Sequence, residues 1–294
     1  MTITCTAARV VPPTAGRRLR ATLTEGVVGL LGLLAALPVA AAPERPLWEL
    51  GVGLAGLRLP HYRGAERSRN WLLPIPYAVY RGEILKADRD GLRLLLIDRE
   101  KLHFDLSANA TPPSDSEDEP IRQGMRKLDG TVEFGPNLNW RLDQGPGWRL
   151  EARLPLRAAF TISSHPRHIG WTAMPNLNLD RMIGPWQFGA QLGWMWGSRD
   201  FNGYYYDVGD ADATAWRPDF RAGAGAAGWQ GTLSASRRDG SRWIGAFLRA
   251  DSLAGSRLRE SPLTRRTSSV SFGVGISWVL WQSSRLVPDR DELR

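Results

Sequence analysis

The chain has 294 residues, among them 31 Gly and 13 Trp, and its formal net charge is +8. With 43% hydrophobic and 23% charged residues, its composition is that of a folded chain rather than a disordered one. A membrane-spanning helix needs about 20 consecutive apolar residues, and no such run follows residue 42. Composition therefore excludes wholesale disorder and a helical membrane protein.

Residues 1–42 have the layout of a secretory signal peptide. Three arginines within residues 17–20 precede an apolar stretch over residues 27–37, and small residues at Ala40 and Ala42 form a cleavage site. Cys5 is the single cysteine, so the mature chain is expected to contain no disulfide. Removal of four Arg and one Glu with the leader lowers the net charge to +5. This modest excess favours anionic lipid head groups over nucleic acid as a partner.

The mature chain alternates between apolar and polar residues, which is typical of strands with one apolar face. Trp186, Phe188 and Leu192, for example, alternate with Gln187 and Gln191. A secreted sandwich also alternates, but strands of about 13 residues are longer than its usual 5 or 6 and match a tilted bilayer crossing. In lipid such strands must close into a barrel, because every backbone polar group needs a partner. The predicted fold is therefore all-β, a transmembrane antiparallel up-and-down β-barrel over residues 43–281.

Twelve strands are predicted, with the third and fourth the least distinct. Tight turns are expected at residues 81–82, 98–100, 143–147, 183–185 and 238–240, and long polar loops at 110–126, 199–217 and 254–267. Bacterial barrels have short periplasmic turns and long outer loops, so an even strand count places both termini in the periplasm. The predicted strands span residues 46–61, 70–81, 83–88, 90–98, 101–109, 127–142, 147–162, 168–181, 186–198, 218–236, 241–253 and 268–281.

The apolar face of these strands is expected to contact outer-membrane lipid, and the polar face to line the lumen. Lumen arginines should pair with Glu and Asp, whereas arginines at the rims could bind lipopolysaccharide phosphates. A polar tail over residues 282–294 is either a free end or a partner contact. The predicted lipid-facing band comprises Phe134, Trp140, Leu150, Leu154, Phe188, Leu192, Trp194, Phe272, Ile276 and Trp278.

Three motifs that suggest catalysis or binding have simpler interpretations. Residues 51–56 and 223–228 fit G-x-G-x-x-G, but they lie within alternating strands rather than before a helix; near Gly228 the alternation slips, which indicates a bulge. Ser164 and His165 lie together, yet a Ser–His pair needs an orienting group and an oxyanion donor. Residues 115–119 hold four carboxylates without the spacing of a Ca²⁺ loop. We therefore expect no catalytic residue, cofactor or metal.

Several segments resemble the MltA-interacting protein (MipA/OmpV) family. Residues 60–65 (PHYRGA) and 73–81 (LPIPYAVYR) resemble its opening motif, which is fairly specific. Residues 115–118, 128–133, 200–208, 220–225 and 261–263 follow in the order expected for the family. Two departures stand out: Tyr206 and Asp207 replace the family's Phe and Gly, and residues 282–294 extend beyond Trp281, where the family usually ends.

The resemblance implies a non-enzymatic protein of the cell outer membrane. Its named member is a scaffold that brings a murein lytic transglycosylase together with a peptidoglycan synthase, and other members look like adhesins, antigens or solute-permeable barrels. A scaffold would act through its periplasmic turns and rim, and a channel through its lumen. The sequence leaves both functions open, and no interaction residue is transferred from the family.

Overall fold

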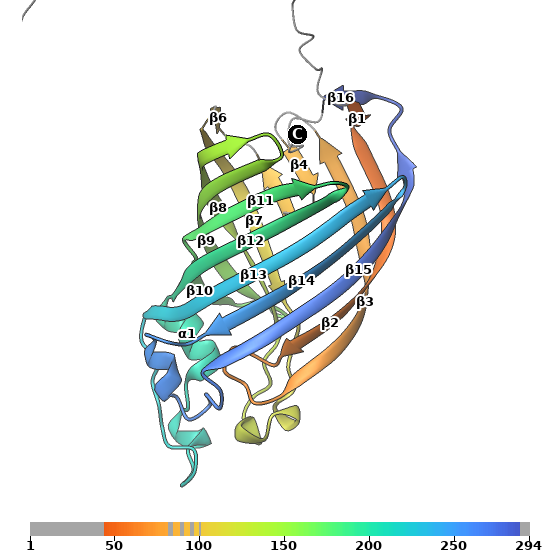
Figure 1. Ribbon diagram of the computed structural model, residues 1–294. Coiled ribbons are helices and arrows are strands. Elements are labelled where there is room, and N and C mark those ends of the chain that lie inside the picture. The colour runs from red at the N-terminus through yellow and green to blue at the C-terminus, as the bar shows by residue number, and fades with distance from the viewer. Residues whose placement is uncertain (1–43, 82–84, 89–90, 95–96, 100, 289–294) are drawn as a thin grey trace, which may run out of the picture. The chain divides into compact units, whose positions relative to one another are not determined.

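The computed structural model describes residues 44–81, 85–88, 91–94, 97–99 and 101–288. The predicted signal peptide, with its cleavage site at Ala40 and Ala42, lies outside the described residues. Nearly all of the regular structure in the described part is antiparallel β-sheet (Figure 1). None of the helices in these ranges is long and apolar enough to cross a membrane.

The strands agree with the sequence pattern in order and mostly in extent. They are β1 (Glu44–Pro46), β2 (Trp48–Pro60), β3 (Ser68–Arg81), β4 (Leu85–Asp88), β5 (Gly91–Leu94), β6 (Ile97–Arg99), β7 (Leu102–Thr111), β8 (Gly130–Gly145), β9 (Trp148–Ile162), β10 (His168–Ala173), β11 (Asn176–Ile183), β12 (Trp186–Gly197), β13 (Gly225–Asp239), β14 (Arg242–Ser252), β15 (Ser268–Gln282) and β16 (Leu286–Pro288).

Fourteen strands form one sheet in the order β5-β4-β3-β2-β15-β14-β13-β12-β10-β9-β8-β7-β6, with β11 between β9 and β12. The chain's first and last long strands, β2 and β15, pair directly, and β5 lies beside β7. The sheet therefore curls back on itself, and the predicted up-and-down barrel is confirmed.

Each of the twelve predicted strands corresponds to one or two strands of the described barrel wall. The predicted strand 168–181 is divided into β10 and β11 at Met174 and Pro175, and both halves pair with β9 and β12. Proline has no N–H to donate to a ladder, which explains the break at this point. Within the predicted strand 90–98 the structure describes β5 and β6, and residues 95–96 lie outside the described part.

The predicted strand 218–236 differs most from the structure, because β13 begins at Gly225 and ends at Asp239. The predicted bulge is present: Met195 pairs with Gly228 and Trp196 with Ala226, so Ala227 is the extra residue. Gly228 has φ +101, and a Cβ there would collide with the backbone carbonyl of Ser252. Glycine at this position thus permits the bulge.

The two faces of the barrel wall differ in the way the alternation predicts. In β15, Ser271 and Ser277 are buried whereas Phe272 and Val274 are exposed. Most residues of the predicted lipid-facing band are exposed, Leu150, Trp194 and Ile276 are half-buried, and none is buried. The outer face of the wall is thus apolar, which is the reverse of a soluble barrel.

The largest buried hydrophobic cluster in the described residues lies in the long loops. These connect β2 to β3, β7 to β8, β12 to β13 and β14 to β15, and we call residues 61–67, 112–129, 198–224 and 253–267 together the cap. Figure 1 shows them at the lower end, with β1 and β16 at the upper end. Its helical segments are η1 (Ser116–Asp118), η2 (Pro120–Arg122), α1 (Arg199–Tyr206), η3 (Asp210–Asp212) and η4 (Arg257–Glu260).

The opposite end consists of short turns and a small additional ladder. Residues 146–147, 184–185 and 240–241 connect long neighbouring strands. Leu286–Pro288 pairs with Glu44–Pro46, so this part of the predicted polar tail is a strand; residues 289–294 lie outside the described residues. Val279 N donates to Ser241 O, and Leu47 N to Arg285 O. The ladder and the turns therefore lie at the same end.

Candidate functional site

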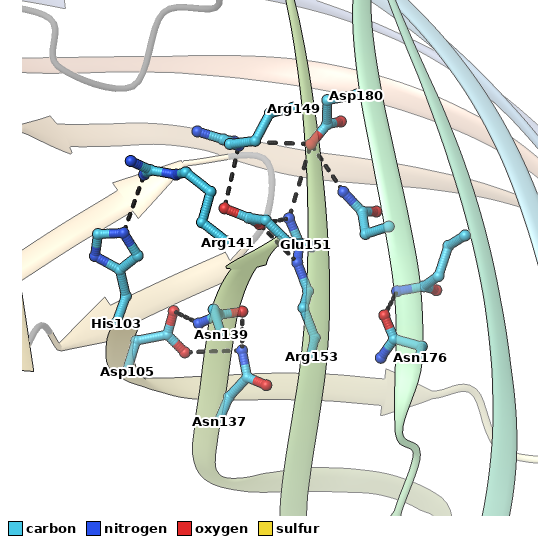
Figure 2. A network of polar contacts seen from close by, with 12 residues as sticks. His103, Asp105, Asn137, Asn139, Arg141, Arg149, Glu151, Arg153, Asn176 and Asp180 are labelled. Carbon is cyan, nitrogen blue, oxygen red and sulfur yellow. Dashed lines mark hydrogen bonds and ion pairs between the residues drawn. The ribbon is translucent and has the colours of Figure 1, made fainter. Parts of the chain in front are cut away.

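A cluster of ion pairs covers one wall of the lumen (Figure 2). Alternate residues of a strand lie on one face, so Arg149, Glu151 and Arg153 of β9 project together. Glu151 binds both arginines, at 3.1 Å from Arg149 Nε and 2.8 Å from Arg153 Nη2. Asp180 of β11 lies 3.7 and 3.8 Å from the same two guanidinium groups. These two arginines and two carboxylates neutralise one another.

The polar wall extends across β8 and β7, where amide groups are the hydrogen-bond donors. Asn137 and Asn139 each donate a side-chain hydrogen bond to Asp105, at 3.0 and 2.9 Å. Arg141 Nη2 lies 3.0 Å from His103 Nε2 (Figure 2). The expectation that lumen arginines pair with acidic residues therefore holds for Arg149 and Arg153 of β9, while amide groups satisfy the carboxylate of β7.

The facing wall, formed by β13, β14, β15, β2 and β3, is built mainly of small and apolar residues. The Phe247 ring lies over Gly273 and the Trp243 ring over Gly245, where a Cβ would clash with them. Between the two walls is a cavity of about 480 Å³, lined by Leu57, Ile75 and Phe247 on one side and by polar side chains such as Arg153 and Arg157 on the other. The lumen thus has a polar wall and an apolar wall.

At the end with the short turns, a buried carboxylate joins distant strands. Glu49 of β2 is 0% exposed. Arg238 of β13 approaches it to 2.7 Å, Arg81 of β3 to 3.4 Å, and the Tyr77 hydroxyl donates to it at 3.3 Å. Since β14 and β15 separate β13 from β2, the Arg238–Glu49 pair links strands that share no ladder.

The cap closes over the other end with its own hydrophobic core. All four of its loops contribute to a cluster of fully or nearly fully buried residues, so the loops pack on one another rather than extend into solvent. Its buried members are Tyr62, Ala65, Ile121, Leu128, Tyr206, Val208, Ala222, Ala227, Leu258 and Leu263, of which Ala227 belongs to β13.

Hydrogen bonds to backbone carbonyls hold the four loops together. Tyr62 donates to Leu263 O at 2.6 Å, and Tyr206 donates to Arg63 O at 2.6 Å. Arg217 donates to the carbonyl oxygens of Ile121 and Gln123, at 2.8 and 3.0 Å. Each of these bonds joins two different loops, so the cap is a single packed unit.

Burial also fixes the protonation of the cap tyrosines. It raises the pKa of Tyr206 to about 12 and raises the pKa values of Tyr62 and Tyr205 as well. The three hydroxyls are therefore un-ionised at neutral pH, and those of Tyr62 and Tyr206 donate to carbonyl oxygens. Burial lowers the pKa of Arg122, whose guanidinium still donates to Tyr205 O at 3.0 Å.

The predicted Ser–His cluster lies outside the cap, in the exposed connection between β9 and β10. Ser164 Oγ is 3.1 Å from His165 Nδ1, and both residues are exposed. Among the described residues no acidic side chain is hydrogen-bonded to this imidazole. A second pair, missed from the sequence, is buried in the cap: His61 Nδ1 lies 2.7 Å from Ser114 Oγ. Because 53 residues separate its members, no local motif indicated it.

The acidic segment 115–119 serves to attach its loop to β3 and to the connection before it. Glu119 is 0% exposed and accepts hydrogen bonds from the backbone N–H groups of Glu66 and Arg67. Asp118 pairs with Arg69 at 3.2 Å. Over the described part of the chain, no three His, Cys, Asp or Glu side chains converge as metal ligands would.

Fold and lumen together define a membrane-spanning β-barrel whose apolar residues face outward. The chain belongs to the family of the MltA-interacting protein MipA, whose family model matches residues 52–280. Family membership and the barrel fold point to the outer membrane of Gram-negative bacteria.

Solved structures that resemble the chain are barrels of low sequence identity. The outer-membrane phospholipase A of Escherichia coli is 12% identical, with 78% of this chain and 92% of that chain covered and a TM-score of 0.33. The Pseudomonas putida toluene transporter TodX is 11% identical, with 81% and 89% covered and a TM-score of 0.33. At these scores neither protein's activity is transferred to this chain. No curated protein matches it.

Proposed function

We propose that this barrel is a non-enzymatic scaffold that binds a murein lytic transglycosylase, and with it a peptidoglycan synthase, at its periplasmic end. The name of its family supports a transglycosylase partner. The observation that carries the proposal is the difference between the two ends of the barrel. The cap forms one end and has a packed core, while the turns and the β1–β16 ladder form the other end.

The end with the short turns corresponds to the periplasmic end of bacterial barrels, and peptidoglycan enzymes work in that compartment. A specific stable contact buries about 800 Å² on each partner, which isolated tight turns do not provide. The β1–β16 ladder adds backbone and side-chain surface beside the turns. This enlarged rim is the surface that we assign to the partner enzymes.

Lipid is the second class of partner that we propose. The exposed apolar band, which includes Phe134, Leu154 and Leu192, faces outward where acyl chains would lie. At the outer rim, exposed arginines such as Arg126 and Arg221 suit the phosphates of lipopolysaccharide.

The alternative functions are a narrow solute channel or a surface adhesin. The cavity of about 480 Å³ supports a lumen that accepts small molecules, and the cap provides a structured outer surface for adhesion. The packed cap core argues against a permanently open pore, so we place the scaffold first. Single-channel conductance of the purified barrel tests whether it is a channel, because an open pore would conduct ions.

Site-directed cross-linking tests the scaffold. The predicted mature chain has no cysteine, so a photo-activated cross-linker can be attached at one engineered thiol. Ser241 lies in a short turn and Ser164 in an exposed connection at the opposite end. We expect Ser241→Cys, and not Ser164→Cys, to cross-link a purified murein lytic transglycosylase. Cross-linking from Ser164→Cys alone, or no measurable binding of the enzyme, would contradict the proposal.

A further inference from the structure

The lumen cavity has a polar wall and an apolar wall. A barrel with a purely structural role needs no such combination. On β9 and β11 it is lined by charged and amide side chains, including Arg153, Arg157 and Asn178. On the facing strands it is lined by Leu57 and Phe247, among others. Lumen-facing positions of membrane barrels are ordinarily polar, so large apolar residues on the inner face require a separate explanation.

Among the described residues, one charged side chain of the cavity lining has no ion-pair partner. The lining contains Arg153, Arg157 and Asp180. Asp180 lies close to Arg149 and Arg153 and accepts a hydrogen bond from Asn178 at 2.8 Å, so its charge is compensated without Arg157.

Arg157 is held by one neutral partner. Its Nε donates to Ser107 Oγ at 2.9 Å. Among the described residues no carboxylate forms an ion pair with Arg157, and nothing is hydrogen-bonded to its two terminal amino groups. The carboxylates of Glu133 and Asp105 attract Arg157 without forming an ion pair with it. Glu133 accepts hydrogen bonds from Thr172 and Asn109, and Asp105 accepts them from Asn137 and Asn139. Arg157 therefore presents a fixed guanidinium with unused donors at the cavity, an arrangement suited to a carboxylate or sulfonate.

We propose that this cavity binds a compact organic anion with an apolar body. The anionic group would accept hydrogen bonds from Arg157, and the apolar body would contact Leu57 and Phe247 on the opposite wall. The volume of about 480 Å³ lies within the range of small-molecule sites. This ligand-binding role is separate from the proposed scaffold, which acts at the rim.

Equilibrium dialysis of the purified barrel in detergent tests the proposal, with micelles alone as the blank. The probes are 2-naphthoate, its uncharged analogue 2-naphthalenemethanol and the cationic 2-naphthylmethylamine, which share one ring system. We expect saturable binding of one naphthoate per barrel, about tenfold tighter than the alcohol, because a charge-assisted hydrogen bond contributes about that factor. Equal affinity for the three probes, or uptake no greater than that of micelles, would overturn the proposal.

Two variants separate the contributions of the two walls. Arg157→Gln should lower naphthoate affinity to that of the alcohol and leave the alcohol unchanged. Phe247→Ala should weaken both ligands alike. The matched control is Arg242→Gln, whose arginine is exposed at a turn and pairs with Asp239; it should bind naphthoate normally. An equal loss in Arg157→Gln and Arg242→Gln would overturn the site, and so would unchanged binding in Arg157→Gln.

A competition arm distinguishes a free organic anion from one derived from lipid. Palmitate carries the same carboxylate on a long acyl chain. We expect it to displace naphthoate more weakly than benzoate does, because the cavity of about 480 Å³ lies between two packed walls of the barrel. Palmitate that competes more strongly than benzoate would overturn the assignment of a compact ligand.

Discussion

The two ends of this barrel are closed by different physical means. At the cap, four loops bury aliphatic and aromatic side chains, and long-range bonds such as Tyr62 to Leu263 O join them. At the turn end, one buried carboxylate, Glu49, gathers two arginines from separate strands. Apolar burial is non-directional, whereas a charged pair requires a fixed geometry. The cap is therefore a small domain on the barrel, and the turn end is a point of attachment between strands.

This difference predicts that each end can be loosened without the other. The strand ladders of the wall connect the two ends, and these ladders do not depend on the packing of the cap. A substitution in the cap should affect proteolysis of the loops before it affects the barrel. A substitution at Glu49 should affect the wall itself. Substitutions in the cap, in the wall and at Glu49 test that separation.

Leu263→Ala should have the largest effect, and it should be confined to the cap. Leu263 is 0% exposed, and truncating a buried leucine costs about 2–5 kcal/mol. We expect the loop 198–224 to become sensitive to limited proteolysis while the barrel keeps its heat-dependent shift on a denaturing gel. Leu286→Ala, at an exposed leucine of β16, is the matched control and should leave the cap resistant. Equal sensitivity of the two variants would mean that the ends are coupled.

Leu192→Arg should disturb the wall between the two ends. Leu192 is exposed on the outer face, whereas Gln191 faces the lumen and donates to Asn176 at 3.1 Å. Arginine on the lipid face near the bilayer midplane costs about 2–4 kcal/mol. Loss of the Gln191 hydrogen bond costs about 1 kcal/mol. Folding into vesicles, followed by gel shift, should therefore fail more in Leu192→Arg than in Gln191→Arg. The reverse order would show that the faces have been assigned wrongly.

The wall of the barrel was predictable from sequence because its information is local. The alternation of Phe188 and Leu192 with Gln187 and Gln191 specifies a strand and both of its faces. Even the bulge at Gly228 was indicated by a slip in that alternation. The sequence also predicted that arginines such as Arg149 and Arg153 pair with acidic residues such as Glu151, since alternate residues of a strand share one face.

The cap and the Glu49 cluster were not predictable, because their members lie far apart in the chain. Tyr62 and Leu263 are 201 residues apart, and Arg238 and Glu49 are 189 apart. No spacing rule connects such residues. The weak signal that was available is the run Tyr204–Tyr206 in an otherwise polar loop. Three consecutive aromatic residues in a loop indicate a packed surface rather than a solvated one.

Glu49→Gln tests the turn end and should have an intermediate effect. The amide keeps an acceptor for Tyr77 but removes the charge that Arg81 and Arg238 share. Losing charge-assisted hydrogen bonds costs about 1.5–3 kcal/mol. Unfolding of the barrel in urea should begin at a lower concentration, with the cap still resistant to protease below it. Ser241→Gln, in a neighbouring turn, is the control. An unchanged urea midpoint in Glu49→Gln would mean that the cluster does not contribute to closure.

Removal of residues 283–294 should have the smallest effect on stability and the most specific effect on binding. Strand β15 ends at Gln282, so the barrel wall stays complete, while the truncated chain loses β16 and its pairing with Glu44–Pro46. If the β1–β16 ladder is part of the proposed rim, capture of the murein lytic transglycosylase should weaken.

A shorter deletion of residues 289–294 leaves the ladder in place and should bind the enzyme normally. Equal loss in both deletions would assign the contact to the last six residues, and no loss in either would exclude the tail. The double change Ser164→Ala with His165→Ala should alter neither assembly nor binding. If it abolished a lipase or deacylase activity of the purified barrel, the non-enzymatic proposal would be wrong, because a scaffold needs no exposed Ser–His pair.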